Sequence, residues 1–271
     1  HPDLLDWLAV EFVEQNWSMK KLLKQIVLSS TYAQSPRISP DNKTKDPQNL
    51  LLGRFPKLRL SAEAIRDNAL RIGGLLTPAL GGPPAYPPQP EGIWWIRDDK
   101  SPKYVTSTGE QRYRRSLYTI WRRTYLHPTL SNFDAPNRVT CSADRERTNT
   151  PLQALTLLND PIFLEAGFGL ARRMFDRSKS NSIKDAIRFG FCLSTTRDPD
   201  QTETDALSGL YEKSLRKFSK DGDSAYKLLN SVRGELALGV SPLNASEVAL
   251  LAAWFQVANV LLNLDETISK G

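Results

Sequence analysis

The stretch that decides the fold class is "SEVALLAAWFQVANVLLNLDET", residues 246–267. It carries no charge from residue 248 to residue 264, a run of 17 residues at the short limit for crossing a membrane. Gln256, Asn259 and Asn263 would lie together on one face of a helix. We therefore predict a helix buried in a protein core and no membrane span. The residues expected inside are Leu250, Trp254, Val257 and Leu261.

Apolar residues recur with helical spacing in much of the remaining chain, so the predicted fold is mainly α. Residues 2–15 and the segment after Ser18 should form a helical hairpin, with Lys20, Lys21 and Lys24 facing water. Its expected core positions are Leu4, Leu5, Leu8, Phe12, Val13, Leu22, Leu23, Ile26 and Val27. Further helices are expected after Ser61, at 151 and 161–176, and over 181–193 and 202–219.

The middle of the chain does not show helical spacing. Residues 77–102 are dense in proline and glycine, which predicts a long extended loop ending at Trp94 and Trp95. The following "RRSLYTIWRR", residues 114–123, could be a strand or a short helix, and its β-branched and aromatic residues allow a small β-hairpin. We expect one domain over residues 1–271. Its parts are helical 1–75, a Pro-rich, aromatic and basic segment 76–135, and helical 150–271.

The net charge of +6 is concentrated in one segment. Between residues 100 and 133 there are seven basic residues and one acid, Glu110, so this segment's excess of six equals that of the chain. Arginines interleaved with aromatics are typical of surfaces that bind anionic polymers. A solvated face with inward-packed aromatic stems is the alternative. The predicted binding residues are Trp94, Trp95, Arg112, Arg114, Arg115, Trp121, Arg122 and Arg123.

A second polar cluster surrounds "RERTNTPLQALTLLND", residues 145–160. Thr150 and Gln153 fit a capping box around Pro151 at the start of a helix. Arg145 and Arg147 lie just before that helix, where a positive charge opposes the helix dipole. We therefore expect a carboxylate partner, Asp134 or Asp160, or an anionic ligand. The cluster comprises Asp134, Arg138, Arg145, Arg147, Asn149 and Asp160, and a purely structural role for it remains open.

Few residues could support catalysis or hold a metal. The two histidines, His1 and His127, are too few for a histidine metal site or a hydrolase triad. Cys141 and Cys192 match no zinc or haem-attachment spacing; they could form a disulfide, but buried free thiols are favoured. No metal or cofactor is expected in this chain. Paired carboxylates, Glu63 with Asp67 or Asp134 with Asp160, leave a polysaccharide hydrolase as the alternative function, although structural ion pairing is favoured for the first pair.

Long motifs support a resemblance over essentially the whole chain. "HPDLLDWLA", "DPQNLLLGRFPKLRLSAEAIRD", "GGPPAYPPQPEG" and above all "FDAPNRVTCSADRERTNTPLQALTLLNDP" resemble the planctomycete-specific PSD domain family. This family forms the C-terminal domain, of unknown function, of large proteins with planctomycete cytochrome-c-like domains. The resemblance implies a secreted, periplasmic or cell-envelope protein whose partners include upstream domains of the same polypeptide. Any haem would belong to those domains.

The resemblance brings no catalytic residue with it, so function must be argued from the chain itself. Because the sequence starts at His1 without a methionine, we expect a domain truncated on its N-terminal side. A non-catalytic binding module that contacts an extracellular anionic polysaccharide is the favoured hypothesis. Nucleic-acid binding also fits the basic and aromatic content, but a secreted location argues against it.

Overall fold

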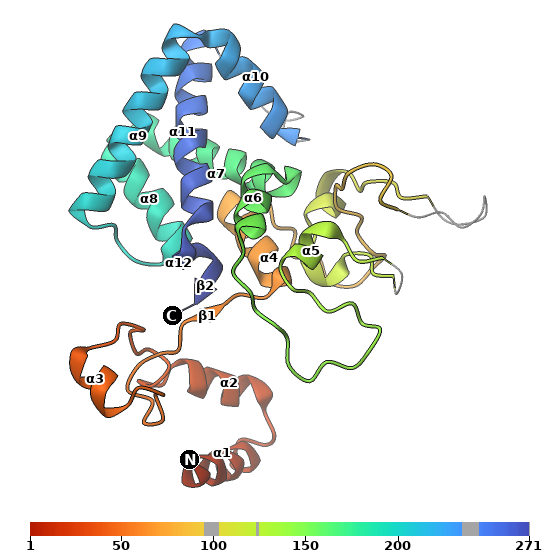
Figure 1. Ribbon diagram of the computed structural model, residues 1–271, viewed down its shortest axis with the longest axis vertical. Coiled ribbons are helices and arrows are strands. Elements are labelled where there is room, and N and C mark those ends of the chain that lie inside the picture. The colour runs from red at the N-terminus through yellow and green to blue at the C-terminus, as the bar shows by residue number, and fades with distance from the viewer. Residues whose placement is uncertain (95–102, 123–124, 235–243, 271) are drawn as a thin grey trace. The chain divides into compact units, whose positions relative to one another are not determined.

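The structure is a computed structural model, and it describes residues 1–94, 103–122, 125–234 and 244–270. Within these residues the chain is mainly α, with twelve α-helices and one two-stranded sheet formed by β1 (Leu58–Arg59) and β2 (Ser269–Lys270) (Figure 1). It divides into two compact units. Residues 1–58 and 269–271 form the first, and residues 59–268 form the second.

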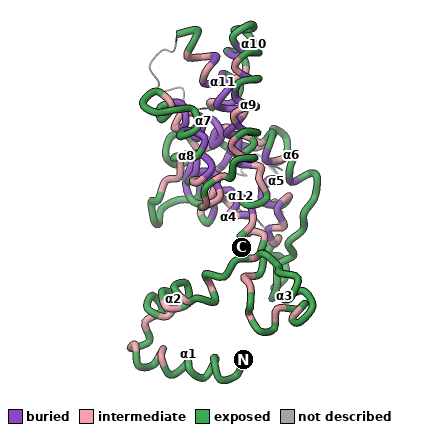
Figure 2. Tube along the Cα trace, turned by 90° about the vertical axis from the view of Figure 1, so that its left-hand side faces the viewer, coloured by how far each residue is buried: buried purple, intermediate pink, exposed green. Residues whose placement is uncertain are grey.

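The first unit contains α1 (Pro2–Glu14), α2 (Met19–Val27) and α3 (Pro40–Lys45). The predicted helical hairpin is therefore present as α1 and α2, and Ser18 accepts the first-turn hydrogen bond that begins α2. The predicted burial of its apolar positions is wrong. No residue of either helix is buried, and Figure 2 shows both largely in the colour of exposed residues. A unit of about 60 residues buries too little surface for a large core.

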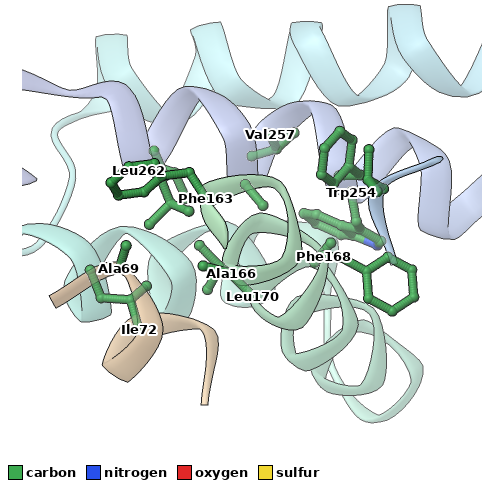
Figure 3. Packing of buried hydrophobic residues seen from close by; sticks show 14 of the residues in the cluster. Ala69, Ile72, Phe163, Ala166, Phe168, Leu170, Trp254, Val257 and Leu262 are labelled. Atoms are coloured by element: carbon green, nitrogen blue, oxygen red, sulfur yellow. The ribbon is translucent and has the colours of Figure 1, made fainter. Parts of the chain in front are cut away.

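The second unit is built around α11 (Ala245–Asn263), the helix predicted from the opening stretch. It packs mainly on α7 (Pro161–Ser180) and α9 (Gln201–Lys220). Trp254, Val257 and Leu261 have no exposed surface, and Leu250 is half-buried against the same core, so the predicted core positions are confirmed (Figure 3). Of the described helices, α11 alone has the length and hydropathy of a membrane span. One such helix, mostly buried in a core, does not indicate a span.

Two glycines allow α4 (Ala62–Gly73) to approach α7 closely. A Cβ atom on Gly73 would lie 2.6 Å from the carbonyl oxygen of Ala166, and one on Gly169 would overlap the carbonyl oxygen of Gly73. Ala69 and Ile72 of α4 face α7 at this contact (Figure 3). Gly74 follows as the left-handed C-cap of α4, a conformation that favours glycine.

The remaining helices of this unit are α5 (Pro128–Asn132), α6 (Pro151–Asn159), α8 (Ile183–Thr195), α10 (Gly222–Val232) and α12 (Asp265–Ile268). Of these, α6, α8 and α10 begin at a residue whose side chain caps them. Reciprocal capping boxes begin α8 at Ser182, α9 at Asp200 and α11 at Asn244. The helices predicted over 181–193 and 202–219 are thus confirmed to within two residues.

Over its described residues the basic segment contains short helical turns of the 3-10 type and no regular strand, so of the two alternatives for residues 114–123 the short helix is the one present. The segment consists of two such turns, η1 (Gly109–Tyr113) and η2 (Ser116–Tyr118), and isolated backbone bridges. Its backbone carbonyl groups accept hydrogen bonds from arginine side chains, and not from the backbone of a neighbouring strand. Arg66 of α4 donates to the carbonyl oxygens of Arg114, at 2.8 Å, and Arg112, at 3.0 Å. Arg114 in turn donates to the carbonyl oxygen of Pro83, which ties down the proline-rich loop.

Candidate functional site

The loop between α5 and α6 is the most exposed ordered segment of the second unit. Every residue from 137 to 150 is exposed, and none lies in a helix or strand (Figure 1). Loops of this length without secondary structure are commonly functional in compact domains. This loop contains most of the predicted polar cluster, so we take it as the starting point of the site.

Both ends of the loop are tied to one another by hydrogen bonds. Thr148 donates to Asp134 from its backbone nitrogen, at 2.7 Å, and from its hydroxyl group. Gln153, which is buried in α6, donates to the Thr148 hydroxyl at 3.1 Å and accepts from Arg59 at 2.7 Å. Asp134 occupies the left-handed region, with φ of 61°. These contacts hold the loop in one conformation at its base.

Arg145 forms an ion pair with Glu63, its Nη1 lying 3.1 and 3.0 Å from the two carboxylate oxygens. The prediction that Arg145 or Arg147 contacts a carboxylate is confirmed, but the expected partners, Asp134 and Asp160, are wrong. Glu63 lies in the first turn of α4, where a carboxylate also complements the helix dipole. The pair joins segments 82 residues apart, which no local pattern could indicate.

The capping box predicted at Pro151 is half formed. The Thr150 hydroxyl accepts a hydrogen bond from the backbone nitrogen of Gln153 at 3.4 Å. The Gln153 side chain does not return to Thr150, because its amide group bonds Thr148 and Arg59 instead. The glutamine therefore links α6, the loop and the residue before α4.

A small cavity lies at the base of the loop, with a volume of about 20 Å³. Arg59, Asp134, Arg145 and Arg147 contribute to its wall. A space of this size holds roughly one water molecule. It is too small for a sugar or another organic ligand, so any binding here takes place on the outer surface of the loop.

The rest of the predicted polar cluster is dispersed. Arg138 lies in the left-handed region, with φ of 58°, and stacks its guanidinium 4.0 Å from the ring centre of Trp121. Asn149 is exposed. Asp160 is the N-cap of α7 and also accepts from Thr129, and its burial raises the pKa of its carboxyl group. Only Asp134, Arg145 and Arg147 come together at one place.

The predicted basic binding face is divided between interior and surface. Arg112 is buried in an ion pair with Glu165, and Arg114 is almost fully buried against backbone carbonyl groups. These two residues are not available to a ligand. Trp94 is also buried, packing on Tyr104 and Tyr125 with ring centres 5.1 and 4.9 Å away.

Arg115, Arg122 and Trp121 reach the surface at least in part. Arg115 is exposed, with Asp67 3.9 Å away. Arg122 covers the ring of Trp94, its guanidinium 4.5 Å from the ring centre. The other two predicted members, Trp95 and Arg123, lie outside the described residues.

The titratable groups beneath this surface are held in uncharged forms by burial. His127 is 3% exposed and its ring lies 3.2 Å from the carbonyl oxygen of Pro88. Desolvation, helped by the charge of Arg66, lowers the pKa of His127 to about 4. Burial likewise raises the pKa of Tyr125 to about 12. Neither group titrates near neutral pH, where a general acid or base is most effective.

The carboxylates considered for catalysis are engaged by the fold. Glu63 binds Arg145, and Asp67 accepts the backbone nitrogen of Ser116 at 2.7 Å. Asp134 holds Thr148, and Asp160 caps α7. Over the described part of the chain, no three His, Cys, Asp or Glu residues come together as a metal site would require.

The two cysteines are free and differ in environment. Cys141 is exposed on the loop, so the prediction that it is buried is wrong. Cys192 is half-buried, and its thiol donates to Asp198 at 3.1 Å. Burial raises the pKa of this thiol, and the hydrogen bond to Asp198 does so further.

Comparison with known proteins identifies the family. The family model described as PSD1, protein of unknown function (DUF1553), matches residues 1–211. The chain belongs to the PSD1 family. No curated protein and no solved structure matches it. Membership of the PSD1 family confirms the resemblance found in the sequence and brings no reaction with it. The function must therefore be inferred from the surfaces described above.

Proposed function

We propose that this PSD1-family chain is a non-catalytic binding module of a secreted or cell-envelope protein, and that it contacts an anionic polysaccharide. The contact surface would comprise Arg122 and Arg138 beside Trp121, together with the exposed Arg115. In the parent protein this module would work beside further domains of the same polypeptide.

The observation that carries the proposal is the stacking of Arg138 on Trp121. It brings the exposed loop against the basic segment, so that Arg138 lies next to Trp121 and Arg122, which are adjacent in sequence. Two sets of residues that were predicted separately thus share one surface. A guanidinium fork on such a surface matches the oxygens of a sulfate or carboxylate group.

The same geometry refines how a polysaccharide would be bound. Guanidinium groups of the protein itself cover one ring face of Trp94 and one of Trp121. Sugar stacking on those faces is therefore blocked, and recognition would rest on the arginine charges. Attraction of this kind is screened by salt. A hydrolase is not favoured, because the candidate acid and base groups serve as hydrogen-bond acceptors within the fold.

Retention on immobilised heparin tests the proposal. We expect the protein to be retained at about 0.15 M salt, where charge attraction still extends over roughly 8 Å, and the Arg115→Ala, Arg122→Ala, Arg138→Ala triple variant to elute earlier. A charge-matched control carries Lys213→Ala, Arg216→Ala and Lys227→Ala, three exposed positions on α9 and α10. Equal elution of the two triple variants would reject the proposed surface. Arg112 and Arg114 are left unchanged because they are buried.

A further inference from the structure

The hairpin of α1 and α2 exposes an unusual amount of apolar surface. Within residues 1–28, eleven large apolar side chains are exposed, from 37% for Ile26 to 70% for Leu28. Large apolar patches on the surface of soluble proteins often mark sites of interaction. The exposed set is Leu4, Leu5, Trp7, Val10, Val13, Trp17, Met19, Leu23, Ile26, Val27 and Leu28.

Polar as well as apolar side chains are half-buried in the hairpin, the apolar ones being Leu8, Phe12 and Leu22. Glu11, Gln15 and Gln25 are half-buried and form a hydrogen-bonded group between α1 and α2. Leu5 and Val10, by contrast, are mostly exposed. A helix with apolar residues around most of its circumference is normally covered by other chain. The outer face of the hairpin is therefore suited to a partner.

The charges of the hairpin are separated between its two helices. α1 contains only acids, Asp3, Asp6, Glu11 and Glu14, whereas α2 contains only lysines, Lys20, Lys21 and Lys24. Among the described residues, the side chains of Asp3, Asp6, Glu14 and these lysines form no hydrogen bond or ion pair. Within one copy, these acidic and basic side chains therefore form no ion pairs with one another.

We infer that the hairpin is the interface for a second copy of this chain, with α1 of each copy packed against α2 of the other. An interface with twofold symmetry must be self-complementary, since the same surface is used on both sides. Crossed packing places acidic α1 against basic α2 twice. Packing of α1 on α1 would bring like charges together, which disfavours that arrangement.

The size of the hairpin fits this role. A stable interface takes about 20–30 residues from each partner, and the eleven exposed apolar side chains of the hairpin, with its exposed charged residues, would supply much of that number. The result is a four-helix arrangement with an apolar centre and alternating charge around it. In this arrangement Gln15 and Gln25 keep their hydrogen bond between α1 and α2 of the same copy.

Charge exchange between two variants tests the inference on the full 271-residue chain. One variant carries Lys20→Glu, Lys21→Glu and Lys24→Glu, so that both helices are acidic. The other carries Asp3→Lys, Asp6→Lys and Glu14→Lys, so that the hairpin is mostly basic. We expect the unmodified chain to dimerise in sedimentation velocity at roughly 1–100 µM, and each variant to bind itself at least about tenfold more weakly.

An equimolar mixture of the two variants should restore the dimer, because each helix then meets its opposite charge. This rescue also excludes misfolding as the cause of the weakened self-association. The control Lys184→Glu, Lys213→Glu, Lys227→Glu makes the same change in net charge at exposed positions elsewhere, and should dimerise like the unmodified chain. A chain that stays monomeric over the whole range, or a mixture that fails to associate, would overturn the inference.

Discussion

Buried arginines account for the irregular middle of the second unit. Arg66, Arg112 and Arg114 are each less than 10% exposed, and burying a cation is costly unless its donors find acceptors. Arg112 meets Glu165, whereas Arg66 and Arg114 donate mainly to backbone carbonyl groups. The sequence placed Arg112 and Arg114 in a cationic run, but their acceptors lie 31 to 53 residues away. Local patterns therefore predicted an exposed basic surface, whereas in the fold these arginines are buried and hold distant segments together.

The burial of His127 predicts a loss of stability in acid. Its pKa in the folded state is about 4, below the ordinary value of 6.5, so the unfolded chain binds the proton more readily. Stability is unaffected above pH 6.5 and falls as the pH drops from about 6.5 to 4, by about 3 kcal/mol in total. Urea unfolding at several pH values measures this loss.

The variant His127→Gln isolates the contribution, since its side-chain amide stands where Nε2 of His127 contacts the carbonyl oxygen of Pro88 and does not titrate. Asp160, whose pKa is raised by burial, acts in the opposite direction, because its neutral form is favoured in the folded state. That effect is common to both proteins and cancels in the difference. Parallel stability curves for the two proteins between pH 7 and pH 4 would refute the assignment.

At the scale of elements, the helices were predictable where their pattern was local. α8, α9 and α11 each begin with a capping residue followed by apolar residues at helical spacing, and both signals lie within the helix itself. The exposed loop could be located from its polar composition, but its pairing of Arg145 with Glu63 could not, because the partner comes from α4. Sequence thus indicates which residues form the cluster and leaves their partners open.

The contact between α4 and α7 depends on glycine. We expect Gly169→Ala to destabilise the protein by about 1–3 kcal/mol, because the new Cβ would overlap a backbone oxygen of α4 that cannot move independently. Gly209→Ala in α9 is the matched control, since no heavy atom lies within 4 Å of the new Cβ. That change should stabilise the helix by up to about 1 kcal/mol. Urea melts giving both variants the same sign would contradict this account of the contact.

At the scale of the whole molecule, the two units differ in what stabilises them. The second unit has a continuous core that includes most of α7 and α11, whereas α1, α2 and α3 bury no residue. Segments with few buried apolar contacts open with a small free energy, and their amides exchange readily. The first unit should therefore depend on a partner for its protection.

Measuring amide hydrogen exchange at several protein concentrations shows whether the first unit is stable on its own or is stabilised by association with a second copy. In dilute, monomeric protein we expect the amides of α1 and α2 to exchange far faster than those of α7 and α11, because only the latter lie in a core. At concentrations where the chain dimerises, protection should rise in α1 and α2 and stay constant in α11, since association stabilises only the segments it covers. The acidic variant with three lysines replaced should lack this rise at the same concentration. Protection of α1 equal to that of α11 in the dilute monomer would mean that the hairpin is stable without a second copy, and its exposed apolar face would then need a different explanation.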